Sequence, residues 1–148
     1  MTTAIDATTT IAAPPDAVWA VLTDWSLAPR WMPGVTAMSG EVSQGAVVTF
    51  TVRGKTRTAV VEVVDAPRTL ALLSRSGPVT ALYTYTLTGT AAGTDLRLLA
   101  DVQVRGLLKV LAPVIRRSIA REDGVQPESL RALIEPTAHR PSSPRPPH

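Results

Sequence analysis

The chain has 148 residues, of which 45% are hydrophobic, and this is enough for one globular domain with a buried core. The net charge is +3, but two arginines fall among residues 136–148, so residues 1–135 are close to neutral and no nucleic-acid partner is expected. No cysteine is present, which excludes disulfides, thiolate catalysis and zinc-thiolate sites.

The first part of the chain predicts one strand and two short helices. Residues 4–12 are rich in β-branched side chains and predict a strand that stops at the two prolines that follow. Pro15 suits the first turn of a helix and Asp16 suits the positive end of its dipole, so a short helix is predicted to about Thr23. Residues 24–34 set two tryptophans and a methionine among turn-forming residues, which favours a second short helix or a tight loop.

Six antiparallel strands are predicted next, because apolar and polar side chains alternate in steps of two through most of this region. Glycine-containing and proline-containing pairs mark the turns between them. In the fifth of these strands Tyr83, Tyr85 and Leu87 share one face, and threonines occupy the other. The predicted strands are 35–41, 48–53, 57–65, 70–76, 79–88 and 96–105.

The last apolar-periodic run, residues 106–135, predicts a long amphipathic helix whose stripe includes Leu111, Ile115 and Ile119. Such a stripe needs a partner, and the strands upstream supply a sheet that can wrap around it. The fold class is therefore α+β. Pro113 either lies in a first helical turn or kinks a helix that began near Leu107. Break signals at 124–127 predict a bend or a restart, and the continuity of the helix there is left open. The charged positions 116–123 are interpreted as a solvated outer face.

Residues 136–148 contain five prolines and no aliphatic side chain larger than alanine, so they cannot offset the entropy lost on ordering. We expect one domain over residues 1–135 and a disordered, proline-rich tail. No apolar run approaches the ~20 residues of a membrane span, and the start of the chain is neither basic nor strongly apolar. A cytoplasmic protein without a membrane span is expected.

Three short stretches carry a resemblance to a known superfamily: Ala-Pro-Pro-Asp-Ala-Val-Trp at 13–19, Asp-Trp at 24–25 and Trp-Met-Pro-Gly-Val at 31–35. With the final long helix, they make residues 3–135 resemble the START-related SRPBCC superfamily and its polyketide cyclase/dehydrase-like branch. The resemblance implies the helix-grip fold of the birch pollen allergen: a seven-stranded curved antiparallel sheet wrapped around a long C-terminal helix, with two short helices between the first two strands. It also implies an apolar ligand cavity, but no particular reaction.

Tyr83 and Tyr85 are the candidate catalytic residues, because two phenols on one face of a strand can donate hydrogen bonds to a carbonyl or an enolate. Packing as core is the alternative for these tyrosines, and also for Trp25 and Trp31. The candidate ligand-binding residues are Trp25, Trp31, Phe50, Tyr83, Tyr85, Leu98, Leu111 and Ile115.

The function expected is binding of an apolar or aromatic small molecule, polyketide-like or lipid-like, in an internal cavity, with cyclase/dehydrase-like activity as the resemblance suggests. A carrier or sensor without activity, and a filled-core domain that acts through protein partners, are the alternatives. Both histidines lie in the tail, so no metal site and no cofactor are expected. The basic turn at 53–57 is a solvated turn or a contact for an acidic partner, and a homo-oligomer is left open.

Overall fold

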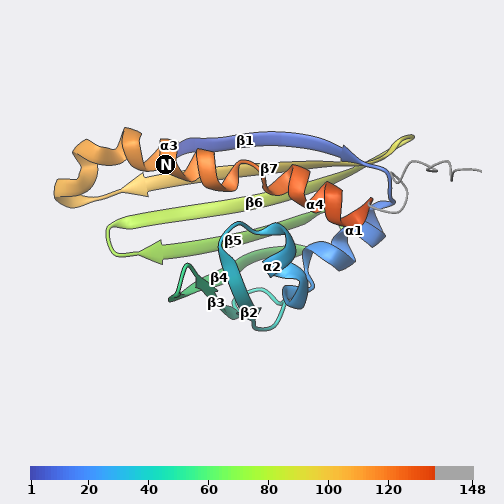
Figure 1. The fold of residues 1–148 in the computed structure, drawn as a ribbon, viewed down its shortest axis with the longest axis horizontal. Coiled ribbons are helices and arrows are strands. Elements are labelled where there is room, and N and C mark those ends of the chain that lie inside the picture. Colours follow the sequence, from blue (N-terminus) through green and yellow to red (C-terminus); the bar gives the residue numbers. More distant parts are fainter. Residues whose placement is uncertain (136–148) are drawn as a thin grey trace, which may run out of the picture.

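The computed structural model describes residues 1–135, which form a seven-stranded antiparallel sheet and helices that pack against it (Figure 1). The strands are β1 (Thr2–Ile11), β2 (Val35–Ser39), β3 (Val47–Val52), β4 (Lys55–Asp65), β5 (Thr69–Ser76), β6 (Val79–Thr90) and β7 (Gly93–Val104). The helices are α1 (Pro15–Leu22), α2 (Ala28–Trp31), α3 (Ala112–Asp123) and α4 (Gln126–Ile134), with short 3-10 helices η1 (Trp25–Leu27) and η2 (Gly106–Leu111). The α+β fold, the seven strands and the two short helices between the first two strands are confirmed.

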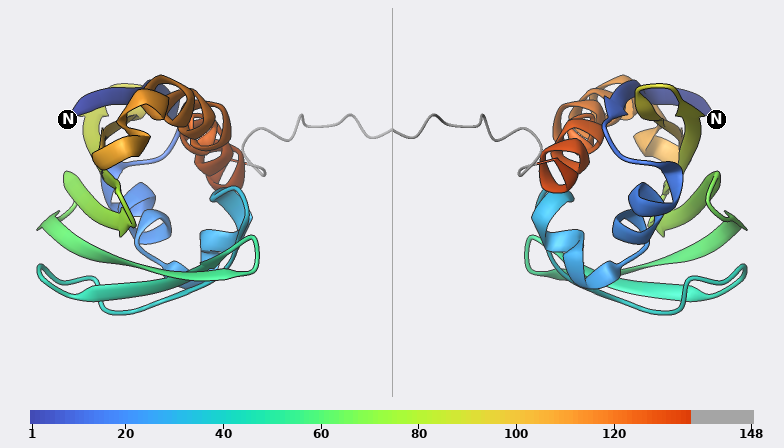
Figure 2. Two further views of the ribbon diagram at one scale, coloured as in Figure 1. Left: turned by 90° about the vertical axis from the view of Figure 1, so that its left-hand side faces the viewer. Right: turned by 90° about the vertical axis from the view of Figure 1, so that its right-hand side faces the viewer.

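The sheet runs in the order β1-β7-β6-β5-β4-β3-β2, so consecutive strands from β2 to β7 are neighbours and β1 pairs with the last of them. The strands β6 and β7 pair along their whole length, from Val79 opposite Val104 to Thr90 opposite Gly93. Seen from its ends, the sheet is strongly curved, and the helices close the gap between its two edges (Figure 2). Contacts of α4 with β1 and with α2, and of α2 with β2, make this closure.

The alternation predicted for the last strand is present in β7. Leu96, Leu98 and Ala100 are buried, whereas Arg97 between them is exposed. These three side chains of β7 join buried residues of β5 and β6 and two tryptophans near the short helices in one main core. The inward face of the sheet therefore carries the apolar residues, as expected for a sheet with one face covered.

The α-helix of the C-terminal run begins at residue 112, so Pro113 lies in a first helical turn, which is one of the two placements left open for it. Residues 106–111 form η2, and α3 begins only at Ala112, because Pro113 fits the first turn of a new helix better than the interior of an older one. Leu111 was expected on the inner stripe, but its side chain is 46% exposed. Ile115 and Ile119 do pack against the cores.

A restart near 124–127 is observed: Gly124 and Val125 separate α3 from α4. The cause is local, because Pro127 lies in the first turn of α4 and has no N–H to donate to the carbonyl four residues earlier, at Asp123. The two helices nevertheless follow one another along the same side of the sheet (Figure 1).

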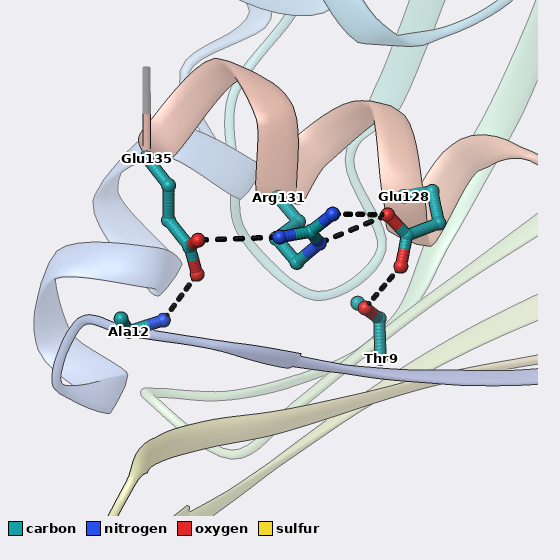
Figure 3. Close-up of polar contacts among 5 residues, drawn as sticks. All are labelled: Thr9, Ala12, Glu128, Arg131 and Glu135. Atoms are coloured by element: carbon teal, nitrogen blue, oxygen red, sulfur yellow. Dashed lines mark hydrogen bonds and ion pairs between the residues drawn. The ribbon is translucent and has the colours of Figure 1, made fainter. Parts of the chain in front are cut away.

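Helix α4 is tied to the end of β1 by a polar network, drawn in Figure 3. The Thr9 hydroxyl donates to Glu128 at 2.6 Å, and the Ala12 N–H donates to the carboxylate of Glu135 at 2.5 Å. Arg131 lies between the two glutamates and pairs with both, at 2.9 Å and 3.3 Å. Because the Glu135 side chain is only 4% exposed, this network fixes the position of α4 against the strand.

The tail predicted to be disordered, residues 136–148, lies outside the described residues. Within residues 1–135, no helix has both the length and the apolar character that crossing a membrane requires. The domain boundary at 135 remains an expectation.

Candidate ligand-binding site

A cavity of about 480 Å³ lies between the inner face of the sheet and the C-terminal helices. Its apolar lining comes mainly from the loop after α2 and from β2, β3, β5 and α3, in particular from Met32, Val35, Met38, Phe50, Leu72 and Ile119. Its polar lining includes Arg53, Lys55, Arg57, Ser74, Ser76, Tyr83, Tyr85, Glu122, Asp123 and Gln126. The core is therefore not filled, and the hollow has a mostly aliphatic and aromatic wall with polar groups in two places.

The first polar group consists of two side chains, one from β6 and one from the last residue of α3. The Tyr83 hydroxyl donates a hydrogen bond of 2.5 Å to the carboxylate of Asp123. Burial and the adjacent carboxylate raise the pKa of Tyr83 well above its ordinary value, so the phenol stays protonated and remains a donor. Burial also raises the pKa of Asp123, although hydrogen bonds from Tyr83 and Gln126 act in the opposite direction.

Tyr85, two residues further along β6, is held from both sides. Its hydroxyl donates to the side-chain oxygen of Gln126 at 2.6 Å, and Trp31 approaches its ring edge-on with a centroid distance of 6.0 Å. Burial raises the pKa of Tyr85 above its ordinary value. Both the ring and the hydroxyl of Tyr85 therefore have partners within the protein.

The second polar group is a set of charged side chains around the β3–β4 turn, where Arg53 adopts a positive φ of 49°. The guanidinium of Arg53 reaches across to Glu122 of α3 at 3.3 Å, and its backbone N–H donates to the carbonyl of Gly34 at 3.0 Å. Arg57 donates to the hydroxyl of Ser76. Because Arg53 and Glu122 are both about half exposed, this charged group marks the solvent side of the cavity.

The structure brings together only some of the eight residues predicted to bind a ligand. Phe50, Tyr83 and Tyr85 line the cavity. Trp25, Trp31 and Leu98 are buried in the main core and are not among the lining residues. Leu111 is exposed in η2, and Ile115 packs against a second cluster formed by Ala81, Val102, Val104 and Ala112.

The residues that the sequence interpretation missed are Glu122, Asp123 and Gln126. Positions 116–123 were interpreted as a solvated outer face, and this was wrong for Asp123, which is partly buried and lines the cavity, whereas Glu122 lines the cavity from an exposed position. A signal was present, because Asp123 follows Ile115 and Ile119 at steps of four and so continues the inner stripe of the helix. A carboxylate on an apolar stripe indicates either a partner or a site.

An antiparallel sheet that grips a C-terminal helical segment around a cavity is the helix-grip fold of the birch pollen allergen. The chain belongs to the polyketide cyclase / dehydrase and lipid transport family, whose model matches residues 2–135. No protein with a curated description matches the chain in sequence.

Solved structures support the same fold. Protein MLL2253 from Mesorhizobium loti is 21% identical with a TM-score of 0.73, and the alignment covers 90% of this chain and 97% of that one. TTHA0849 from Thermus thermophilus is 15% identical with a TM-score of 0.71, covering 90% and 98%. Ara h 8.0201 is 14% identical with a TM-score of 0.65, covering 90% and 97%. At these identities the likeness shows a shared fold.

The cavity offers hydrogen-bond donors, a carboxylate and an apolar wall. No group of three histidine, cysteine, aspartate or glutamate side chains within residues 1–135 is placed to hold a metal ion. Among the lining residues, Tyr83 has an O–H that can donate a hydrogen bond, and Asp123 has a carboxylate that can accept a proton.

Proposed function

We propose that this protein binds an apolar or aromatic small molecule, polyketide-like or lipid-like, in the cavity between the sheet and α3. The observation that carries the proposal is the cavity itself, whose volume of about 480 Å³ falls within the range of ligand pockets. Phe50, Leu72 and Ile119 supply apolar surface, and its burial by a ligand contributes about 25 cal/mol per Å² before the costs of association.

The polar groups would orient this ligand. Tyr83 presents a phenol that remains protonated at neutral pH, so by turning its O–H away from Asp123 it can donate to a carbonyl or phenolic oxygen inside the cavity. Arg53, Lys55 and Arg57 line the solvent side, where they favour an oxygen-bearing or anionic end of the same molecule. The expected ligand thus has an apolar body with oxygen substituents.

A second candidate function is catalysis of the cyclase/dehydrase type, and it is favoured by the contact between Tyr83 and Asp123. In an intramolecular aldol closure, Asp123 would remove a proton from the carbon beside a carbonyl, and Tyr83 would redirect its O–H to the resulting enolate oxygen. The enolate carbon then bonds to a second carbonyl carbon, and the alkoxide formed there takes the proton back from Asp123. The raised pKa of Asp123 suits both proton transfers.

A carrier or sensor is the alternative that requires only the shape and the lining of the cavity. A carrier does not need proton transfer by Asp123. Removal of that carboxylate should therefore abolish the activity of an enzyme but leave the ligand binding of a carrier intact. We favour ligand binding over a filled-core domain that acts through protein partners, because a cavity lies between the sheet and α3.

Ligand binding can be tested with flat aromatic polyketide-like compounds, by calorimetry and by quenching of tryptophan fluorescence. Ala81 lines the cavity, so Ala81→Phe should fill part of it and weaken binding. Leu82→Phe on the other face of β6 is the matched control and should leave the affinity unchanged. If no such compound binds, or if both variants behave alike, the proposal fails.

Catalysis can be tested with the same compounds that bind. Asp123→Asn preserves an acceptor for Tyr83 but removes the base, so it should retain binding and abolish turnover. A wild type that binds these compounds and converts none of them would favour the carrier.

A further inference from the structure

We propose that the segment formed by η2 and the first turn of α3 docks this protein onto anionic membrane surfaces. This segment contains Leu107 and Val110, whose side chains are 95% and 81% exposed. Leu108, Leu111 and Val114 beside them are also exposed. Five large aliphatic side chains that face solvent within eight consecutive residues are unusual on a globular surface and indicate an interaction site.

The shape of the molecule separates this segment from the core. Figure 1 shows the chain between β7 and α3 at one end of the molecule, on the left, beyond the end of β7. Gly106 begins the segment with a φ of +69°, a left-handed conformation that turns the chain away from the strand. No side chain of η2 is buried. The leucines and valines thus form a protruding apolar tip.

The charges around the tip favour an anionic partner. Residues 105–121 contain five basic side chains and no acidic one. Lys109, Arg117 and Arg121 are exposed, and none of the ion pairs observed within residues 1–135 includes them. Lys109 lies between the apolar side chains, where its long stem can extend along lipid tails while the ammonium stays with the headgroups.

An apolar tip that contains Lys109 and is followed by exposed cations along α3 matches the interface of an anionic bilayer better than it matches a protein partner. Burial of the apolar side chains in the outer layer of the membrane supplies one part of the affinity, and attraction between the cations and anionic headgroups supplies the other. Neither part requires a helix that spans the membrane.

The tip is also connected to one wall of the cavity. The Arg105 N–H, just before η2, donates to the carbonyl of Pro78 in the β5–β6 turn at 2.9 Å. Ser76 and Val79 on either side of that turn line the cavity. Docking by the tip would therefore bring the cavity wall close to the lipid, although the docking itself does not depend on a ligand.

The test is co-sedimentation of the full chain with vesicles of phosphatidylcholine containing phosphatidylglycerol, and with vesicles of phosphatidylcholine alone. We expect binding to the anionic vesicles that weakens as salt is added. Leu107→Glu combined with Val110→Glu should weaken it by at least about tenfold, because both apolar insertion and charge attraction are reduced. Val47→Glu replaces another exposed valine, in β3, and should leave binding unchanged.

A second variant separates the electrostatic part. Arg117→Gln with Arg121→Gln removes two exposed cations from α3 and should weaken binding to anionic vesicles about tenfold or more, with no loss of helix content by circular dichroism. Failure of the wild type to bind anionic vesicles would overturn the proposal. So would equal loss in Val47→Glu, or a dimer in solution by light scattering that the Leu107→Glu, Val110→Glu variant dissociates, since the tip would then bind a second copy.

Discussion

The hydroxyl of Tyr83 lies 2.5 Å from a carboxylate oxygen of Asp123, forty residues further along the chain. This contact joins the inner face of β6 to the point where α3 ends. It also places a protonated phenol and a partly buried carboxylate together on the wall of the cavity. A change at either residue should therefore affect both the wall of the cavity and the stability of the fold.

Removal of the Tyr83 hydroxyl should lower the stability of the fold more than it lowers the affinity for an apolar ligand. Tyr83→Phe leaves the Asp123 carboxylate without the hydrogen bond from Tyr83, and we expect the free energy of unfolding to fall by about 1–3 kcal/mol. Tyr83→Phe combined with Tyr85→Phe should still bind aromatic compounds but lose any turnover. Urea denaturation and calorimetry measure the two effects, and loss of all binding in the double variant would argue against a mainly apolar site.

The two tyrosines should not ionise in the folded protein. The chain contains only these two, so the near-ultraviolet absorbance of tyrosinate reports on this site alone. Their pKa values are raised in the folded state, so their contribution to stability is complete below the unfolded pKa of about 10 and is lost as the pH rises above it. Tyrosinate should appear together with loss of the circular dichroism signal. Ionisation near pH ~10 with the fold intact would contradict the buried geometry.

Asp123 should make the protein less stable as the pH rises through the acid range. Its pKa is raised in the folded state, so the folded protein holds the proton more tightly than the unfolded chain does. The contribution to stability is complete below the unfolded pKa of about 3.9 and is lost as the pH rises through the folded value. Asp123→Asn should remove this dependence. Urea denaturation over that pH range tests it, and identical slopes for the two proteins would show that the carboxylate is solvated.

The polar network between α4 and β1 should stabilise the fold mainly through Glu135, its buried carboxylate. Glu135→Ala leaves the N–H of Ala12 without this acceptor, and we expect the free energy of unfolding to fall by about 1–3 kcal/mol. Glu128→Ala removes a mostly exposed carboxylate and should cost about 0–1 kcal/mol. Thermal or urea denaturation compares the two, and a larger loss in Glu128→Ala would reverse this assignment.

Ile115 and Leu111 were predicted on one helical stripe, but their replacement by alanine should affect the free energy of unfolding differently. Ile115 packs against the second core cluster, so Ile115→Ala should lower the free energy of unfolding by about 2 kcal/mol. Leu111→Ala, at an exposed position of η2, should change it by less than about 0.5 kcal/mol. Equal costs for the two variants would place Leu111 in the core in solution.

Most of the fold could be predicted from local patterns. The alternation in β7 and the common face of Tyr83 and Tyr85 follow from the period of a strand, which does not depend on its neighbours. The restart before α4 follows from Pro127, whose missing N–H interrupts a helix in any surroundings. These properties belong to short stretches of chain, so the sequence alone determined them.

The site depended on packing that no single stretch contains. The rotation of α3 against the sheet decides that Asp123 meets Tyr83, and the position of α2 decides that Trp31 packs against Tyr85 in the core while Phe50 lines the cavity. The same packing leaves Leu111 exposed, although its spacing matches that of Ile115. Periodicity states which residues share a face, but only the tertiary structure decides what that face contacts, because the free energy of burial depends on how all the elements fit together.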